Sequence, residues 1–162
     1  MLIEAAKPWP VASASMTPTV ILGSSTCVRF LTTLTSNHAV ARSTLHTLYL
    51  EGHSAVRDAV FAALVMRQID AGRTIILLAS HGWDHISWVP PQSLLDAARR
   101  TDAVVYAATY EHEGVSPRKY ARLLDDLAEE TGGRVLVVED GRDLRGVFVN
   151  ILAEFRSRYV LT

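Results

Sequence analysis

Two uninterrupted apolar runs of strand length, residues 74–80 and 103–109, constrain the fold of this chain more than any other feature. A strand that is apolar on both faces must be covered on both faces, and helices provide that cover in a parallel sheet. Segments with helical periodicity lie before, between and after the two runs. Each run is far shorter than the roughly 20 residues that a membrane-spanning helix requires. The sequence therefore predicts a three-layer α/β/α fold around a mostly parallel sheet.

The other elements are predicted from breakers and caps. Ser54 is placed to cap one helix, and Ser116 before Pro117 is placed to cap another. A serine hydroxyl at the start of a helix can accept a hydrogen bond from a backbone amide of the first turn. Residues 19–24 and 27–34 are β-branched and apolar, which favours a hairpin or two closely linked strands. We expect strands over residues 19–24, 27–34, 74–80, 103–109 and 134–139, and helices that start near residues 37, 54, 93, 116 and 143.

Length and composition favour one domain. The chain has 162 residues, 49% of them apolar, which is enough to close one sizeable core. No internal repeat, low-complexity tract or interdomain linker divides it. Residues 1–18 carry no clear pattern. We predict an irregular N-terminal segment over residues 1–18 and one domain over residues 19–162.

Charge and cysteine content exclude several kinds of partner. The net charge is −1, so the chain has no basic field that would attract nucleic acid or an anionic membrane. Cys27 is the single cysteine, which excludes an intramolecular disulfide and a cysteine-rich zinc site. The first ten residues lack the basic start and apolar core of a secretory signal. We expect no nucleic acid, no membrane partner and, by default, a cytoplasmic location.

Several short segments stand in an order and spacing that a generic doubly wound domain would not be expected to carry. They are LTSN at 34–37, GHSAVRDA at 52–59, IILLASHG at 75–82, LAEETGG at 127–133 and FRSRYVL at 155–161. Together they resemble the von Willebrand factor type A (VWA) family, particularly its bacterial branch, over residues 19–161. The resemblance implies a Rossmann-like sheet with one antiparallel edge strand.

The resemblance also implies a metal-ion-dependent adhesion site that has degenerated. Family members hold a divalent cation with an Asp-x-Ser-x-Ser loop, a threonine and an aspartate. By position, Ser54 matches the threonine and His81, before Gly82, matches the aspartate. Imidazole supplies no anionic oxygen, so we expect the magnesium site to be lost. The nearest echo of the first loop has Val11 in place of its aspartate, and we interpret this echo as chance.

The apparent loss of that loop raises a question about the sheet. In the family, the first strand lies between the second strand and the strand that matches residues 74–80. Its absence would expose backbone donors and acceptors. Three interpretations remain open: a truncated fragment without the first strand and helix, a domain completed by a partner, or an irregular substitute supplied by residues 1–16.

Four histidines fall in loops expected at the carboxyl ends of the strands, where parallel sheets bind ligands. They are His53, His81, His85 and His112. With Asp84, Glu111 and Glu113 nearby, they form a hypothetical site for a transition metal such as zinc. The alternative is that these loop histidines are simply solvated, since no compact zinc signature is present.

Trp83 and Trp88 flank an unusually apolar connection that contains Ile86 and Val89. One interpretation is a recognition patch for a partner. The other is that both rings lie back on the adjacent helix and complete the core. The sequence favours neither interpretation.

The resemblance leads us to expect a non-enzymatic interaction or scaffold domain that binds a protein. Its expected contact residues are Ser54, His81, Trp83, Asp84, Trp88 and Glu111. A hydrolase built from Ser80-His81, Asp58 and Asp84 lacks the Gly-x-Ser-x-Gly pattern of a nucleophile elbow. The alternatives are a transition-metal site at His53, His81, His85 and His112, which could be hydrolytic, and a gene remnant without selected activity.

Overall fold

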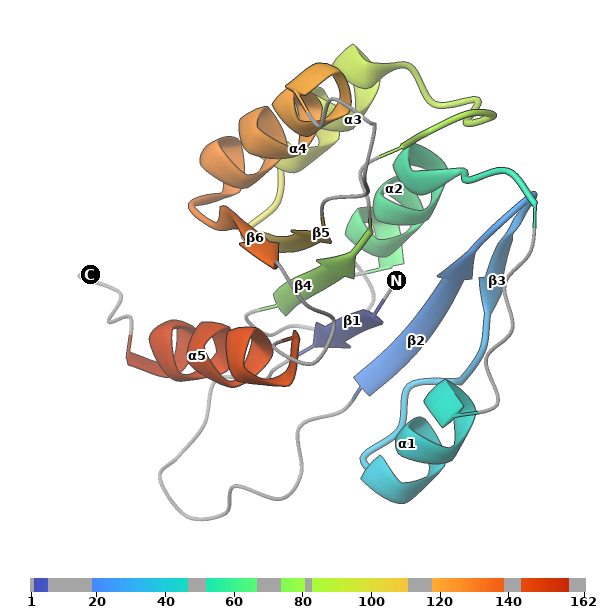
Figure 1. Ribbon diagram of the computed structural model, residues 1–162, viewed down its shortest axis with the longest axis vertical. Helices are drawn as coiled ribbons and strands as arrows, with labels where there is room; N and C mark the ends of the chain where they lie inside the picture. Colours follow the sequence, from blue (N-terminus) through green and yellow to red (C-terminus); the bar gives the residue numbers. More distant parts are fainter. Residues whose placement is uncertain are drawn as a thin grey trace.

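A computed structural model describes residues 2–5, 19–46, 52–66, 74–80, 83–110, 118–138 and 144–157. Within these residues, strands form one sheet with helices around it (Figure 1). The strands are β1 (Leu2–Ala5), β2 (Thr19–Ser24), β3 (Val28–Phe30), β4 (Thr74–Ala79), β5 (Val104–Tyr110) and β6 (Arg134–Val138). The helices are α1 (His38–His46), α2 (Val56–Met66), α3 (Pro91–Arg99), α4 (Arg118–Thr131) and α5 (Leu144–Ser157). None of these helices is both long and apolar enough to cross a membrane.

The sheet has the order β3-β2-β1-β4-β5-β6. Strands β4, β5 and β6 are parallel to one another. Strand β2 points the same way, because β1 pairs antiparallel with both β2 and β4. Strand β3 closes one edge antiparallel to β2, as expected. Helices α2, α3 and α4 pack on one face of the sheet and α5 on the other, which confirms the three-layer α/β/α prediction (Figure 1).

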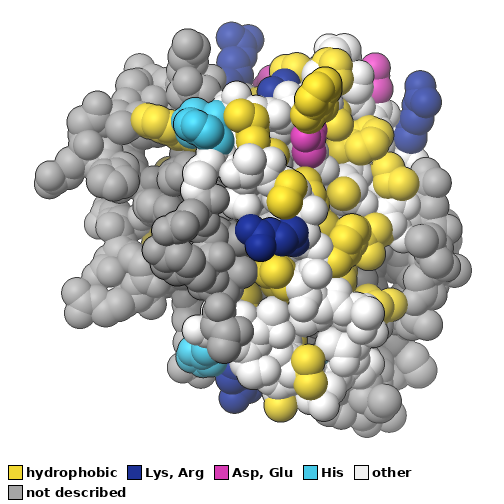
Figure 2. Space-filling view, turned by 90° about the vertical axis from the view of Figure 1, so that its right-hand side faces the viewer, with side chains coloured by type: hydrophobic (Ala, Val, Ile, Leu, Met, Phe, Trp, Pro, Cys, Tyr) yellow, Lys and Arg dark blue, Asp and Glu magenta, His cyan; other side chains and the backbone are white. Residues whose placement is uncertain are grey.

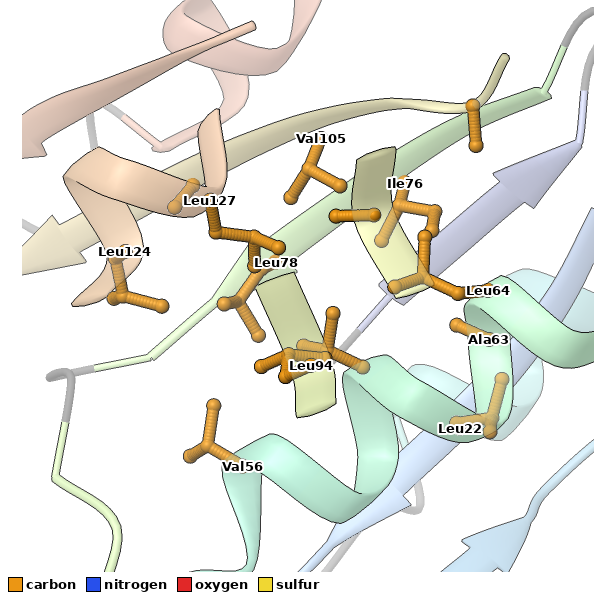
Figure 3. Close-up of a cluster of buried hydrophobic side chains, with 14 of the residues drawn as sticks. Leu22, Val56, Ala63, Leu64, Ile76, Leu78, Leu94, Val105, Leu124 and Leu127 are labelled. Atoms are coloured by element: carbon orange, nitrogen blue, oxygen red, sulfur yellow. The ribbon is translucent and has the colours of Figure 1, made fainter. Parts of the chain in front are cut away.

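The alternation of side chains along β4 explains why its sequence is continuously apolar. Ile76 and Leu78 point into the cluster formed with α2, α3 and α4 (Figure 3). Ile75 and Leu77 point to the opposite face, where Ile151 of α5 covers them. Each of these β4 side chains is at most 1% exposed. Burying a side chain of this size contributes about 1.5–3 kcal/mol, so both faces of the strand favour the layered fold.

Strand β1 corrects two predictions. Residues 2–5 are not irregular: they form a strand between β2 and β4, where Leu2 pairs with Ile21 on one side and Leu77 on the other. The described sheet therefore does not lack a strand at this position: β3 is the predicted antiparallel edge strand, and β1 is an additional antiparallel strand inside the sheet. A strand in this central position pairs with the backbone amides and carbonyls of β2 and β4 that face it. An antiparallel strand also avoids the long crossover that a parallel connection to β2 would require.

Strand β3 is shorter than the predicted run of residues 27–34. After Phe30, the amide of Leu31 still donates to the Ile21 carbonyl at 2.9 Å. The amide of Ile21 then donates to the Thr32 hydroxyl at 2.9 Å instead of to a backbone carbonyl. A side chain thus replaces a backbone partner and ends the regular pairing. The predicted cap of α4, Ser116, lies outside the described residues.

Candidate functional site

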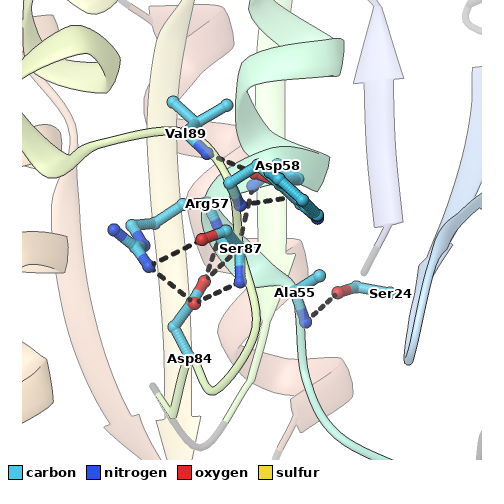
Figure 4. A network of polar contacts seen from close by, with 8 residues as sticks. Ser24, Ala55, Arg57, Asp58, Asp84, Ser87 and Val89 are labelled. Atoms are coloured by element: carbon cyan, nitrogen blue, oxygen red, sulfur yellow. Dashed lines mark hydrogen bonds and ion pairs between the residues drawn. The ribbon is translucent and has the colours of Figure 1, made fainter.

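Two loops meet at the edge of the sheet where β2 and β4 end. Residues 52–55 lead into α2, and residues 83–90 lead into α3. The His85 amide donates to the Ser54 carbonyl at 2.8 Å. The Ala55 amide donates to the hydroxyl of Ser24, the last residue of β2, at 3.2 Å (Figure 4). These bonds join the loops at the edge where parallel sheets bind ligands.

Asp84 holds the second loop against the start of α2 (Figure 4). Its Oδ2 accepts hydrogen bonds from the Arg57 amide at 2.7 Å and from the Ser87 hydroxyl at 2.6 Å. Its Oδ1 accepts from the Arg57 guanidinium and from the Ser87 amide, both at 3.2 Å. Burial raises the pKa of the Asp84 carboxyl, but the hydrogen bonds from Ser87 and Arg57 outweigh burial and hold the pKa below its ordinary 3.8. The ionised carboxylate therefore caps the amide end of α2.

Asp58, in the first turn of α2, fixes the next part of the same loop. Its carboxylate accepts hydrogen bonds from the amides of Trp88 at 3.1 Å and Val89 at 2.8 Å. Its own amide donates to the Ser87 hydroxyl at 3.2 Å. Two carboxylates thus define the backbone of the loop from Asp84 to Val89. Both carboxylates accept hydrogen bonds from backbone amides, a structural role that the hydrolase hypothesis did not include.

The two tryptophans of this loop lie in different environments. Trp88 is 92% exposed, so its ring does not complete the core. Trp83 is half-buried, and its ring centroid lies 5.4 Å from that of His85. Figure 2 shows hydrophobic side chains at several places on one face of the molecule, with polar surface and basic side chains among them. Single exposed apolar side chains are ordinary, but an indole this exposed is unusual.

His53 and His85 are neighbours on the surface. Their ring centroids lie 5.4 Å apart with the planes inclined by 48°, and both residues are exposed. His81, Glu111 and His112 lie outside the described residues, so their place at the site stays a prediction. Within the described part of the chain, no group of three or more His, Cys, Asp or Glu side chains is placed to hold a metal ion.

Sequence reasoning missed the residues that organise the site. Ser54 was predicted as a ligand, and its carbonyl is the group seen to join the loops. Arg57 and Ser87 were not predicted, although they donate all four hydrogen bonds to Asp84. An acidic residue in the first turn of a helix, here Asp58, was the available signal, because it is favourable at the amide end. Its partners lie about thirty residues later and carry no local pattern.

Comparisons with known proteins show the fold. No family model and no curated protein sequence matches the chain. The conserved hypothetical protein BatB from Bacteroides thetaiotaomicron is similar in structure, with a TM-score of 0.63 and 12% identity over 86% of this chain and 79% of that one. An aerotolerance-related membrane protein from Bacteroides fragilis NCTC 9343, crystallised with multiple mutations to serines, has a TM-score of 0.59 and 14% identity over 83% and 78%. The SpRpn10 VWA domain has a TM-score of 0.54 and 15% identity over 81% and 69%. With the sheet order and the two helix layers, these likenesses show that the chain has a von Willebrand factor type A fold.

Proposed function

We propose that this chain is a non-enzymatic interaction domain that binds a protein through the loop of residues 83–90, without magnesium. The observation that carries the proposal is Trp88, which is 92% exposed at the carboxyl edge of the sheet. Tryptophan is enriched among the residues that dominate binding energy at protein interfaces. An indole left in water contributes nothing to the core, so contact with another molecule is the role that it fits best.

The backbone around Trp88 is held in place by the domain itself. The Asp58 carboxylate accepts hydrogen bonds from the amides of Trp88 and Val89, and the Asp84 carboxylate accepts one from the amide of Ser87. Ordering a loop during association opposes binding, so a loop that is already fixed binds more tightly for the same contacts. The proposed contact residues are Ser54, Trp83, Asp84 and Trp88, together with His81 and Glu111 from outside the described residues.

The proposed independence from magnesium rests on ligand chemistry. Magnesium prefers anionic oxygen ligands in near-ideal octahedral geometry. His81, which matches the family's aspartate by position, offers none. Asp58 and Asp84 already accept hydrogen bonds from backbone amides, and Asp84 also pairs with Arg57. Moving either carboxylate to a metal ion would break those bonds, which argues for recognition by shape and polar contact.

Site-specific photo-cross-linking tests this proposal. A photoreactive amino acid replaces Trp88 in one variant and Val149, which is 57% exposed on α5, in the matched control. Both variants are irradiated in cells of the organism that encodes the chain, with and without chelation of magnesium. We expect a discrete adduct from position 88, none from position 149, and no effect of chelation. Equal labelling from both positions, or loss of the adduct with magnesium, would overturn the proposal.

The partner identified in this way permits a quantitative test. Trp88→Ala should weaken its affinity by about 2 kcal/mol or more, roughly thirtyfold, if the indole is an anchor of the interface. Val149→Ala is the control and should leave the affinity unchanged. Isothermal titration calorimetry measures both values. Unchanged affinity in Trp88→Ala would place the interface elsewhere.

A further inference from the structure

His53 and His85 come from different loops and meet at the surface. Their ring centroids are 5.4 Å apart, and both side chains are exposed, so an ion and its water ligands can reach them. We propose that the two imidazoles bind one divalent transition-metal ion of the zinc, copper or nickel class, with water completing its coordination shell. Imidazole suits all three metals and is the commonest protein ligand for them.

The spacing of the two rings fits joint ligation. A zinc ion lies about 2.1 Å from an imidazole nitrogen and therefore about 3.2 Å from the ring centre. Two imidazoles at a tetrahedral angle around one ion then have ring centres about 5.2 Å apart. The observed separation of 5.4 Å is close to this value. The separation of the two rings is therefore compatible with one ion bound between them.

The loops that carry the two histidines are held in place by the fold. The His85 amide donates to the Ser54 carbonyl, next to His53, at 2.8 Å. Gly52, just before His53, has a φ of 92°, and a Cβ there would lie 2.6 Å from the Thr26 hydroxyl oxygen. The positive φ favours glycine at that turn. A pair of ligands on fixed backbones loses less conformational entropy when it binds an ion.

This site goes beyond the proposed protein contact and depends on different side chains. His53→Ala and His85→Ala remove an imidazole and leave Trp88 in place. Trp88→Ala removes the proposed anchor and leaves both imidazoles. Failure of the metal site and failure of the partner contact are therefore distinguishable.

Titration of the purified full chain with zinc chloride, followed by calorimetry, tests the site. We expect one equivalent to bind, and both His53→Ala and His85→Ala to lower the affinity about tenfold or more, equivalent to about 1.4 kcal/mol. The matched control is His46→Ala, an exposed histidine at the end of α1, which should bind zinc as the unsubstituted chain does. Circular dichroism of each variant confirms that the fold is kept.

Copper provides a second readout that does not depend on heat. The ring centroids of Trp83 and His85 lie 5.4 Å apart, so Cu²⁺ bound at His85 should quench the fluorescence of Trp83. Trp83→Phe should weaken this quenching, because Trp83 is the tryptophan whose ring lies beside that of His85. Unaltered zinc affinity in either His53→Ala or His85→Ala would overturn the two-histidine site. Absence of zinc binding by the unsubstituted chain, or an equal loss in His46→Ala, would do the same.

Discussion

Replacing Asp84 with alanine tests how strongly the loop and α2 stabilise each other. The Asp84 side chain is 10% exposed and its partner Arg57 is 20% exposed. The carboxylate accepts four hydrogen bonds, from Arg57 and Ser87. Its removal leaves the Arg57 amide and the Ser87 amide and hydroxyl without this acceptor, and the guanidinium keeps only its hydrogen bond to the Ser87 carbonyl at 3.2 Å. Breaking a fully buried pair costs about 3–5 kcal/mol, and the partial exposure of Arg57 reduces the expected loss to about 2–4 kcal/mol.

Urea unfolding at neutral pH measures this loss as a change in the free energy of unfolding. Asp96→Ala is the matched control, because Asp96 pairs with Arg99 where the two side chains are 48% and 46% exposed. Exposed pairs contribute about 0–1 kcal/mol, so the control should change little. Adding Arg57→Ala to Asp84→Ala should cost less than Arg57→Ala alone, since the pair is already broken. Equal losses for Asp84→Ala and Asp96→Ala would refute the reasoning.

The same carboxylate predicts a dependence of stability on pH. The pKa of Asp84 in the folded chain lies below the ordinary 3.8 that we expect in the unfolded chain. Folding therefore favours the ionised form, and the stabilisation is fully present above the unfolded pKa. It is lost as the pH falls below 3.8 through the folded pKa. The gap in unfolding free energy between the unsubstituted chain and Asp84→Ala should narrow on acidification, and a constant gap would contradict this account.

Three further substitutions test the fold. Leu78→Ala, at a side chain 1% exposed, should lower the free energy of urea unfolding by about 2–5 kcal/mol, and a loss below about 1 kcal/mol would contradict the packing described. Gly133→Ala places a Cβ 1.8 Å from the Val105 carbonyl oxygen and should lower the melting temperature sharply, whereas Gly146→Ala on α5 meets nothing within 4 Å and should not. Ile3→Pro removes a backbone donor from central strand β1 and should promote self-association through β2 and β4. Size-exclusion chromatography with light scattering measures this association, and a monomer of unchanged stability would contradict the role of β1.

The sequence predicted the elements whose residues are buried on both faces. Strands β4 and β5 stood out because helices cover each side of the sheet there, which demands an apolar residue at every position. Strand β1 has only four residues, one of them Glu4, so it carries neither an apolar run nor a clear alternation. Its place depends on the unpaired backbone of β2 and β4, which are distant in sequence. The sequence pattern within residues 2–5 does not show that two distant strands have unpaired backbone groups.

The sequence predicted where the candidate site lies, but not which residues hold its loops together. The sequence analysis placed His53 and His85 in loops at the same end of the sheet, and their ring centroids lie 5.4 Å apart. The exposure of Trp88 could not be predicted, because the same loop carries a second tryptophan, Trp83, that is half-buried. The backbone at Trp88 is fixed by Asp58 of another element, whose carboxylate accepts a hydrogen bond from the Trp88 amide.

The direction of β1 also bears on the metal chemistry of this edge. In the family that the chain resembles, the first strand delivers an aspartate-containing loop to the carboxyl ends of its parallel neighbours. Here β1 runs the other way and ends where β2 and β4 begin, because Glu4 pairs with Thr19 and Ala5 with Thr74. A carboxylate placed directly after β1 would be about 17 Å, the length of a six-residue strand, from the end of β4. The direction of β1 is therefore, beside the imidazole at position 81, a second argument for the proposed independence from magnesium.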